Sequence, residues 1–180
     1  DPPGSMDLDQ ALHLERTDDG FVLHYAIADV YALVEPGGAL DAETHRRGQT
    51  YYLPDGSVPL HPRELSEGTA SLLPDAVRPA VLWRIETDHR AEPVAVSVRR
   101  ALVRSVARMH YAGVQRDADA GRLHPSVEAL PDFGRLREAA ALARGAIELR
   151  LPAQDVVQDG DDWTLQIEPR TEADEWNSEI

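Results

Sequence analysis

The chain has 180 residues and 42% hydrophobic content, which is enough to bury the core of one domain or of a large part of one. The absence of Cys excludes disulfides and thiol catalysis, and no apolar run approaches the roughly 20 residues of a membrane span, so no membrane partner is expected. The formal net charge of −14 argues against nucleic-acid binding, because a basic surface is the usual electrostatic signature of such proteins. Without a signal-peptide pattern or cysteines, the composition fits a cytoplasmic protein.

Two alternating segments near the start predict a β-hairpin. Apolar and polar residues alternate over residues 11–15 and again over residues 21–29, and the Thr-Asp-Asp-Gly sequence between them is typical of a turn. Asp29 ends the second strand, where it either lies near the acidic residues before the hairpin or caps the following turn. His24 is interpreted as a structural residue rather than a ligand.

The middle of the chain predicts one short helix and further strands. Residues 39–47 form a helix that Gly48 stops, and residues 51–54 follow as a short extended piece in which Tyr51 points to the core. Residues 60–73 contain several prolines and predict a loop with one helical turn.

Two longer strands are predicted next, over residues 79–87 and 94–103, with Trp83 in the core. Consecutive strands of this length favour an antiparallel sheet.

The last third predicts helices and a second hairpin. Residues 110–121 have a helical pattern, and residues 132–149 form the clearest helix, whose apolar stripe, ending in Ala143 and Ile147, should pack on the sheet. Residues 156–167 form a hairpin, and a capping box beginning at Thr171 introduces a final helix. The fold class expected is therefore α+β, with a mostly antiparallel sheet packed by helices.

The first ten residues hold the strongest candidate for a site. Asp1, Asp7 and Asp9 lie on a short loop that two prolines stiffen, directly before the first alternating strand. Carboxylates two residues apart in extended backbone point to the same side, and such oxygen donors suit Mg²⁺ better than Zn²⁺. With 32 acidic residues in the chain, an Asp-x-Asp pair alone is expected by chance. Neither the calcium loop of an EF-hand nor a phosphatase-type Asp-x-Asp fits the flanking residues.

These residues resemble the start of the RNB catalytic domain of the ribonuclease II and ribonuclease R family. Further motifs occur in the order and spacing of that family, closely over about the first ninety residues. They are His24-Tyr-Ala-Ile-Ala-Asp29-Val, Leu40-Asp41, Arg47-Gly48, Tyr52-Leu53-Pro54, Val58-Pro-Leu60, Pro62, Leu65-Ser66 and Ser71-Leu72.

The resemblance implies a Mg²⁺-dependent exoribonuclease that degrades single-stranded RNA from its 3′ end and releases nucleoside 5′-monophosphates. Asp1, Asp7 and Asp9 would hold the metal, expected as two ions with Mn²⁺ as a substitute, and Tyr52 would stack on a base. Residues 1–180 would be the N-terminal portion of the RNB catalytic domain. The rest of the polypeptide, with the remaining RNB helices and flanking RNA-binding domains, would then be a partner of this part.

One position departs from the family pattern. Gln10 occupies the place of a fourth aspartate, and a neutral amide can contact a water or an ion but cannot act as a base near neutral pH. Two alternatives therefore stay open: the same chemistry with Gln10 and Asp9 at the catalytic positions, or a catalytically silent RNA-binding module. A third is a structural metal loop in an unrelated enzyme.

Overall fold

A computed structural model describes residues 4–53, 56–147 and 151–180. Its strands are β1 (Gln10–Thr17), β2 (Gly20–Ala28), β3 (Tyr51–Leu53), β4 (Gly56–Val58), β5 (Val77–Thr87), β6 (Pro93–Arg104), β7 (Ala153–Asp159) and β8 (Asp162–Glu168). Its α-helices are α1 (Ala39–Arg47), α2 (Tyr111–Asp119), α3 (Leu130–Ala143) and α4 (Glu172–Ser178). Short 3₁₀ segments η1 (Val30–Ala32) and η3 (Pro125–Val127) and the π-helical turn η2 (Glu64–Thr69) complete the set. No helix within the described ranges has the length and apolar character needed to cross a membrane.

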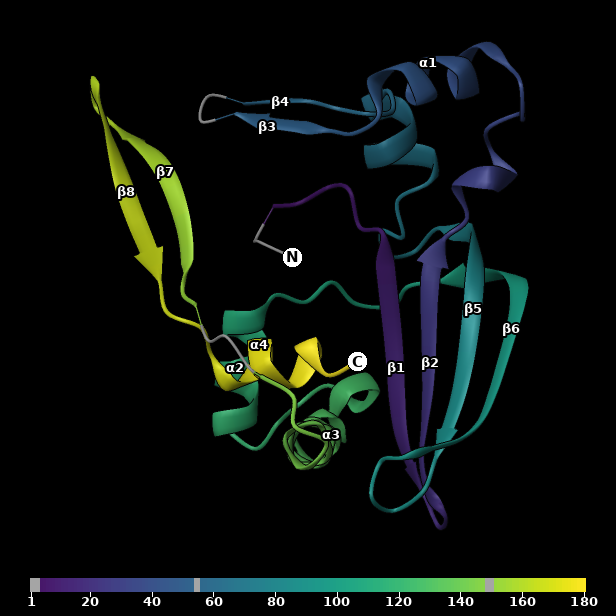
Figure 1. Ribbon diagram of the computed structural model, residues 1–180, viewed down its shortest axis with the longest axis vertical. Coiled ribbons are helices and arrows are strands. Elements are labelled where there is room, and N and C mark those ends of the chain that lie inside the picture. The colour runs from purple at the N-terminus through teal and green to yellow at the C-terminus, as the bar shows by residue number, and fades with distance from the viewer. Residues whose placement is uncertain (1–3, 54–55, 148–150) are drawn as a thin grey trace.

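Four strands form the central antiparallel sheet, in the order β1-β2-β5-β6 (Figure 1). The β1–β2 hairpin pairs Thr17 with Gly20, as the alternating pattern and the turn residues predict. Gly20 has φ +146°, and a Cβ there would lie 2.2 Å from the carbonyl oxygen of Thr87. The close approach of β5 to this turn therefore requires glycine.

The main core fills the space between one face of the sheet and the helices. Figure 1 shows α2, α3 and α4 gathered on the β1 side of the sheet. The Phe21 ring of β2 meets the Phe133 ring of α3 edge-on, with 5.4 Å between centroids. In α3, Gly134 lets α4 come close, because a Cβ there would lie 2.7 Å from Trp176. The predicted packing of this helix on the sheet is therefore confirmed.

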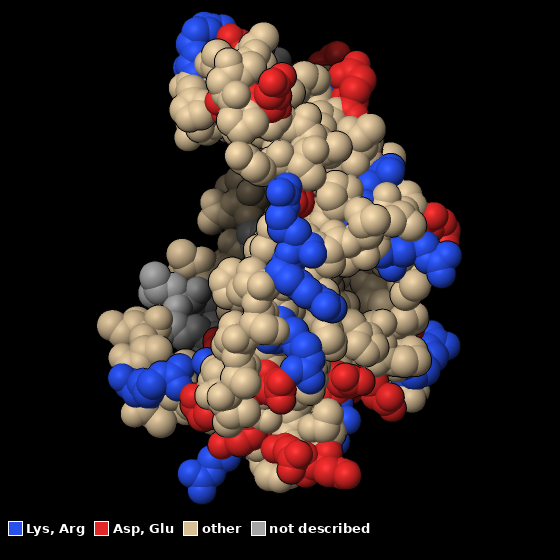
Figure 2. Space-filling view, turned by 90° about the vertical axis from the view of Figure 1, so that its right-hand side faces the viewer, with Lys and Arg blue, Asp and Glu red and all other residues tan. Residues whose placement is uncertain are grey.

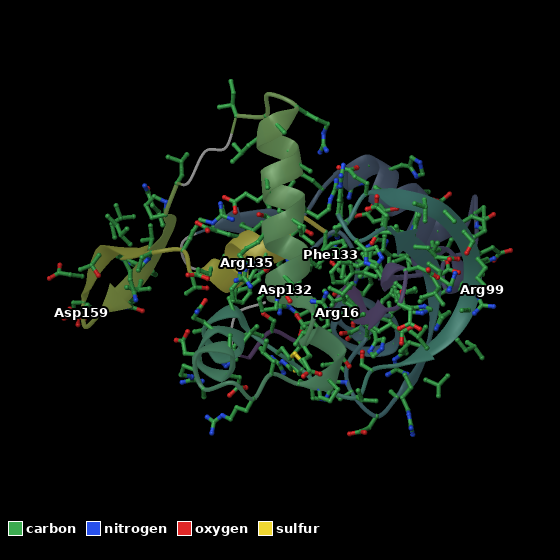
Figure 3. All side chains as sticks on the ribbon, turned by 90° about the horizontal axis from the view of Figure 1, so that it is seen from below. Arg16, Arg99, Asp132, Phe133, Arg135 and Asp159 are labelled. Carbon is green, nitrogen blue, oxygen red and sulfur yellow. The ribbon has the colours of Figure 1, made fainter. Side chains whose placement is uncertain are left out.

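Ion pairs surround the start of α3 (Figure 3). Asp132 accepts from both Arg16 of β1 and Arg135 of the same helix. All three side chains are about half exposed, so these pairs contribute little to stability.

A smaller core lies on the opposite face of the sheet. Leu72, which is 2% exposed, packs there with Ala26 of β2 and Ala80 of β5. Leu72 follows η2, so this cluster fixes the segment that leads from the predicted loop back into the sheet. The prediction of one helical turn between residues 60 and 73 is confirmed.

Three predictions about helix ends and burial are wrong. The helix predicted over residues 132–149 ends at Ala143, because Gly145 adopts φ +83°, and Ile147 is 89% exposed instead of lying on the core stripe. Positions 148 and 149 lie outside the described residues. Tyr51 and Trp83 are exposed by 51% and 37%, so neither belongs to the core.

The other predicted elements are confirmed with small shifts. Helix α1 covers residues 39–47 and ends at Gly48 with φ +80°. Helix α2 is capped by the His110 ring, which accepts from the backbone N–H of Gly113. The β7–β8 hairpin pairs Val156 with Leu165, and Thr171 and Asp174 form the predicted capping box of α4.

Candidate metal and RNA site

The loop before β1 presents its two described carboxylates outward and its leucine inward. Leu8 is 6% exposed, whereas its neighbours Asp7 and Asp9 are exposed. The backbone N–H of Leu72 donates to Leu8 O at 2.8 Å, and that of Ala28 donates to Asp9 O at 2.8 Å. The apolar residue between two acids thus attaches the loop to the sheet and leaves both carboxylates accessible.

The charge of Asp7 acts on the Asp9 carboxylate. Partial burial and, next, the negative charge of Asp7 raise the pKa of Asp9, while the nearby His61 opposes that change. No hydrogen bond or ion pair joins either carboxylate to another described residue. Two accessible carboxylates that form no ion pair with a described residue are a donor set that fits Mg²⁺, which takes one or two carboxylates and fills its shell with water and phosphate oxygens.

Two of the three predicted metal ligands, Asp7 and Asp9, are among the described residues. Asp1 lies outside the described residues, and within residues 4–53, 56–147 and 151–180 no three His, Cys, Asp or Glu side chains gather closely enough to hold a metal ion. Asp7 and Asp9 are brought together, and the ligand set of Asp1, Asp7 and Asp9 stays a prediction.

Gln10 is the first residue of β1 and connects the loop to a cleft. The cleft has a volume of about 470 Å³ and lies between β1 and residues 105–110, which connect β6 to α2. Gln10 and Leu8 line it, but Asp7 and Asp9 do not. Gln10 is exposed, so its amide is available to a water or a ligand, while its catalytic role stays a prediction.

His24 also lines this cleft, across from His13 of β1 at a ring-centroid distance of 6.3 Å. Burial, followed by the positive charge of Arg84, lowers the pKa of His24. The ring is therefore neutral at pH 7.

Tyr52 is on the β3–β4 hairpin, which Figure 1 shows at the same end of the sheet as the loop before β1. Its side chain is among the most accessible of the large hydrophobic ones, at 79% exposure. An accessible ring can stack on a nucleobase, whereas a core tyrosine cannot. Stacking by Tyr52 stays a prediction that its exposure permits.

Asp29 has a partner that the sequence does not indicate. Its side chain is 5% exposed, and its carboxylate accepts from Nε of Arg100 at 2.6 Å. Although Asp29 precedes η1, its side chain forms no cap hydrogen bond, so the interpretation as a cap is wrong. The Arg100 guanidinium lies 5.6 Å from the centroid of the Tyr31 ring. The pair joins β2 to β6 beside the strand end that holds the loop.

The arrangement of a four-stranded antiparallel sheet, flanking helices and an acidic loop before β1 is that of a known domain family. The profile of the RNB domain matches residues 1–180, and the chain belongs to this family. The predicted fold class and family are thereby confirmed.

Ribonuclease R of Mycoplasma pneumoniae is 35% identical over 176 residues, which cover 93% of this chain and 24% of the relative. The human exosome complex exonuclease RRP44 is 32% identical over 157 residues, which cover 84% of this chain and 16% of the relative. The structure of Mycoplasma genitalium RNase R in complex with double-stranded RNA matches 99% of this chain and 34% of that chain, with 26% identity and a TM-score of 0.91. The chain thus spans about a quarter or less of these curated relatives.

Proposed function

We propose that residues 1–180 are the N-terminal portion of the catalytic domain of a Mg²⁺-dependent exoribonuclease. The full-length protein would hydrolyse single-stranded RNA from its 3′ end in the cytoplasm and release nucleoside 5′-monophosphates. The observation that carries this proposal is the pair of accessible carboxylates, Asp7 and Asp9, on a loop that is hydrogen-bonded to the sheet of an RNB domain. The relatives, a ribonuclease and an exonuclease, support the same reaction class.

Each residue would have a defined task. Asp7 and Asp9, with Asp1, would hold the metal, which when bound supplies Lewis-acid stabilisation of the charge that develops on the phosphate. Gln10 would orient a water through its amide oxygen, and Tyr52 would stack on the terminal base. Mn²⁺ would substitute for Mg²⁺, since both accept carboxylate oxygens.

The reaction balances as a hydrolysis. The water oxygen bonds to the phosphorus of the last phosphodiester, and the bond from that phosphorus to the 3′ oxygen of the preceding nucleotide breaks. One water proton ends on this 3′ oxygen. The terminal nucleotide leaves with its 5′-phosphate, and the shortened RNA again has a free 3′ hydroxyl.

The test is to incubate the full-length protein with end-labelled single-stranded RNA, with and without a chelator. We expect release of mononucleotides that stops when the chelator is added and resumes with excess Mg²⁺. Release that continues in the chelator would contradict the metal requirement, and internal cleavage would contradict action from the end.

Gln10 supports a second candidate, a catalytically silent RNA-binding module, because an amide cannot accept a proton near neutral pH. This candidate predicts that the wild-type protein binds RNA without cleaving it. Gln10→Asp separates the two: under the exoribonuclease proposal the variant keeps or raises an activity that the wild type already has. Activity that appears only in Gln10→Asp would favour the silent module.

A further inference from the structure

The buried hydroxyl of Ser71 binds the acidic loop at two points. Its Oγ donates to Met6 O at 2.6 Å and accepts from the backbone N–H of Leu8 at 2.9 Å. Ser71 is 1% exposed and is separated from these partners by 65 and 63 positions in the sequence. A single side chain therefore connects the segment that follows η2 to the loop before β1.

The two points lie on either side of Asp7. The carbonyl of Met6 belongs to the peptide group that precedes Asp7, and the N–H of Leu8 belongs to the one that follows it. Since φ and ψ of a residue are the rotations between its two flanking peptide groups, one hydroxyl that holds both groups restricts both angles. The direction of the Cα–Cβ bond of Asp7, and with it the reach of the carboxylate, is set by this contact.

Ser71 is itself fixed to the scaffold. The next residue, Leu72, is buried against Ala26 and Ala80, and its N–H donates to Leu8 O. On the other side, Nε of Arg78 donates to Ser71 O at 3.3 Å. The loop is thus hydrogen-bonded to a side chain that is itself fixed to the sheet.

We propose that Ser71 is a positioning residue for Asp7, holding its carboxylate in the direction needed for the divalent cation that Asp7 and Asp9 share. This inference rests on the proposed metal site. Partners that orient metal ligands typically change metal affinity by about 10–100-fold when they are removed. A serine that served stability alone would have no such effect.

Ser71→Ala in the full-length protein tests the inference, with Thr87→Val as the matched control. Thr87 is also buried, at 4% exposure, and its hydroxyl donates to Phe21 O at 3.4 Å, at the end of β5 remote from the loop. Both variants lose a buried hydroxyl, and only Ser71→Ala frees the peptide groups beside Asp7.

Two measurements test the inference, and both begin with metal-free protein. We expect amide hydrogen exchange at Leu8 to be about tenfold faster in Ser71→Ala, the effect of losing one hydrogen bond, and unchanged in Thr87→Val. We expect Mn²⁺ binding, followed by electron paramagnetic resonance and defined as the binding lost in Asp9→Asn, to be about tenfold or more weaker in Ser71→Ala alone.

Unchanged exchange at Leu8 in Ser71→Ala overturns the inference, as does faster exchange with wild-type Mn²⁺ affinity. If the wild type and Asp9→Asn bind Mn²⁺ equally, it is the proposed metal site that fails, while the exchange measurement still tests the contact. If Ser71→Ala does not fold, Ser71→Cys replaces it with the same expected results, because a thiol is a much weaker hydrogen-bonding group of similar shape.

Discussion

The loop with Asp7 and Asp9 and the hairpin with Tyr52 lie at the same end of the sheet but are held in different ways. Backbone groups of Met6, Leu8 and Asp9 are all hydrogen-bonded to buried or paired parts of the scaffold. Strands β3 and β4 have three residues each and, within the described part of the chain, pair with no other strand than each other; the large side chains of this hairpin are exposed.

The difference matches the two tasks proposed. Carboxylates that hold a cation beside a scissile phosphate must be placed before the substrate arrives, because misplacement by about 1 Å can cost about a hundredfold in rate. A ring that stacks on bases tolerates motion, since every base offers a flat face. Under the proposed function, a loop fixed to the sheet would carry the chemistry and an exposed hairpin would contact the substrate.

The largest expected effect comes from the rigid loop. Asp9→Asn should lower the rate of mononucleotide release about 10³-fold, because Lewis-acid stabilisation is worth several kcal/mol and each 1.4 kcal/mol is tenfold. RNA binding, measured by filter retention, should stay near wild type. Turnover within tenfold of wild type would contradict the assignment of Asp9.

The same variant has a pH signature without metal. Since the folded-state pKa of Asp9 is raised, its contribution to stability is complete below the ordinary aspartate pKa and is lost as the pH rises through the folded-state value. Asp9→Asn should therefore slightly raise the melting temperature of the metal-free protein at pH 7, and the difference should vanish at pH 3. A lower melting temperature at pH 7 would contradict the burial and repulsion ascribed to Asp9.

A change in the core should act on stability instead of chemistry. Phe133→Ala removes a side chain that is 3% exposed and should lower the free energy of unfolding by about 3–5 kcal/mol, as measured by denaturant titration. Ile147→Ala is the control, because its side chain is 89% exposed and should change stability by less than about 0.5 kcal/mol. Equal losses in the two variants would show that α3 does not pack as described.

A smaller effect than that of the core variant Phe133→Ala is expected at the hairpin. Tyr52→Ala should weaken binding of short single-stranded RNA by about 1–3 kcal/mol and change the length at which trimming stalls more than the chemical rate. Its melting temperature should match wild type. Tyr51→Ala, which alters the neighbouring and less exposed ring, should change RNA binding less. A larger loss of RNA binding in Tyr51→Ala than in Tyr52→Ala would assign the stacking ring to Tyr51.

Local signals in the sequence predicted most elements of the fold. Gly48 ends α1 and Thr171 starts α4 because a positive φ and a side-chain cap are properties of single residues and their near neighbours. The same rule holds in α3, where Gly145, and not the apolar pattern beyond it, decides the end.

Contacts between distant segments could not be predicted. Alternation placed Trp83 on one face of β5 but could not show that the helices leave that part of the face open. The partners of Asp29 and Ser71 lie about 60 to 70 positions away, and no periodicity relates residues at such separations. In the site, the acidic loop was predicted from spacing, whereas the contacts that hold it required the structure.

Among the strands that the structure describes, β6 is an edge of the sheet, and this has a consequence for how copies of the chain meet. It pairs with β5 on one side, and its outer N–H and C=O groups would be a template for a strand of another molecule. Arg99 and Arg104 lie on it, as does Arg100, whose charge is paired with Asp29, and Figure 2 shows basic side chains in a column over this side of the molecule. Two such edges repel each other, and salt weakens that repulsion. Aggregation of the protein through this edge is therefore expected to increase with ionic strength.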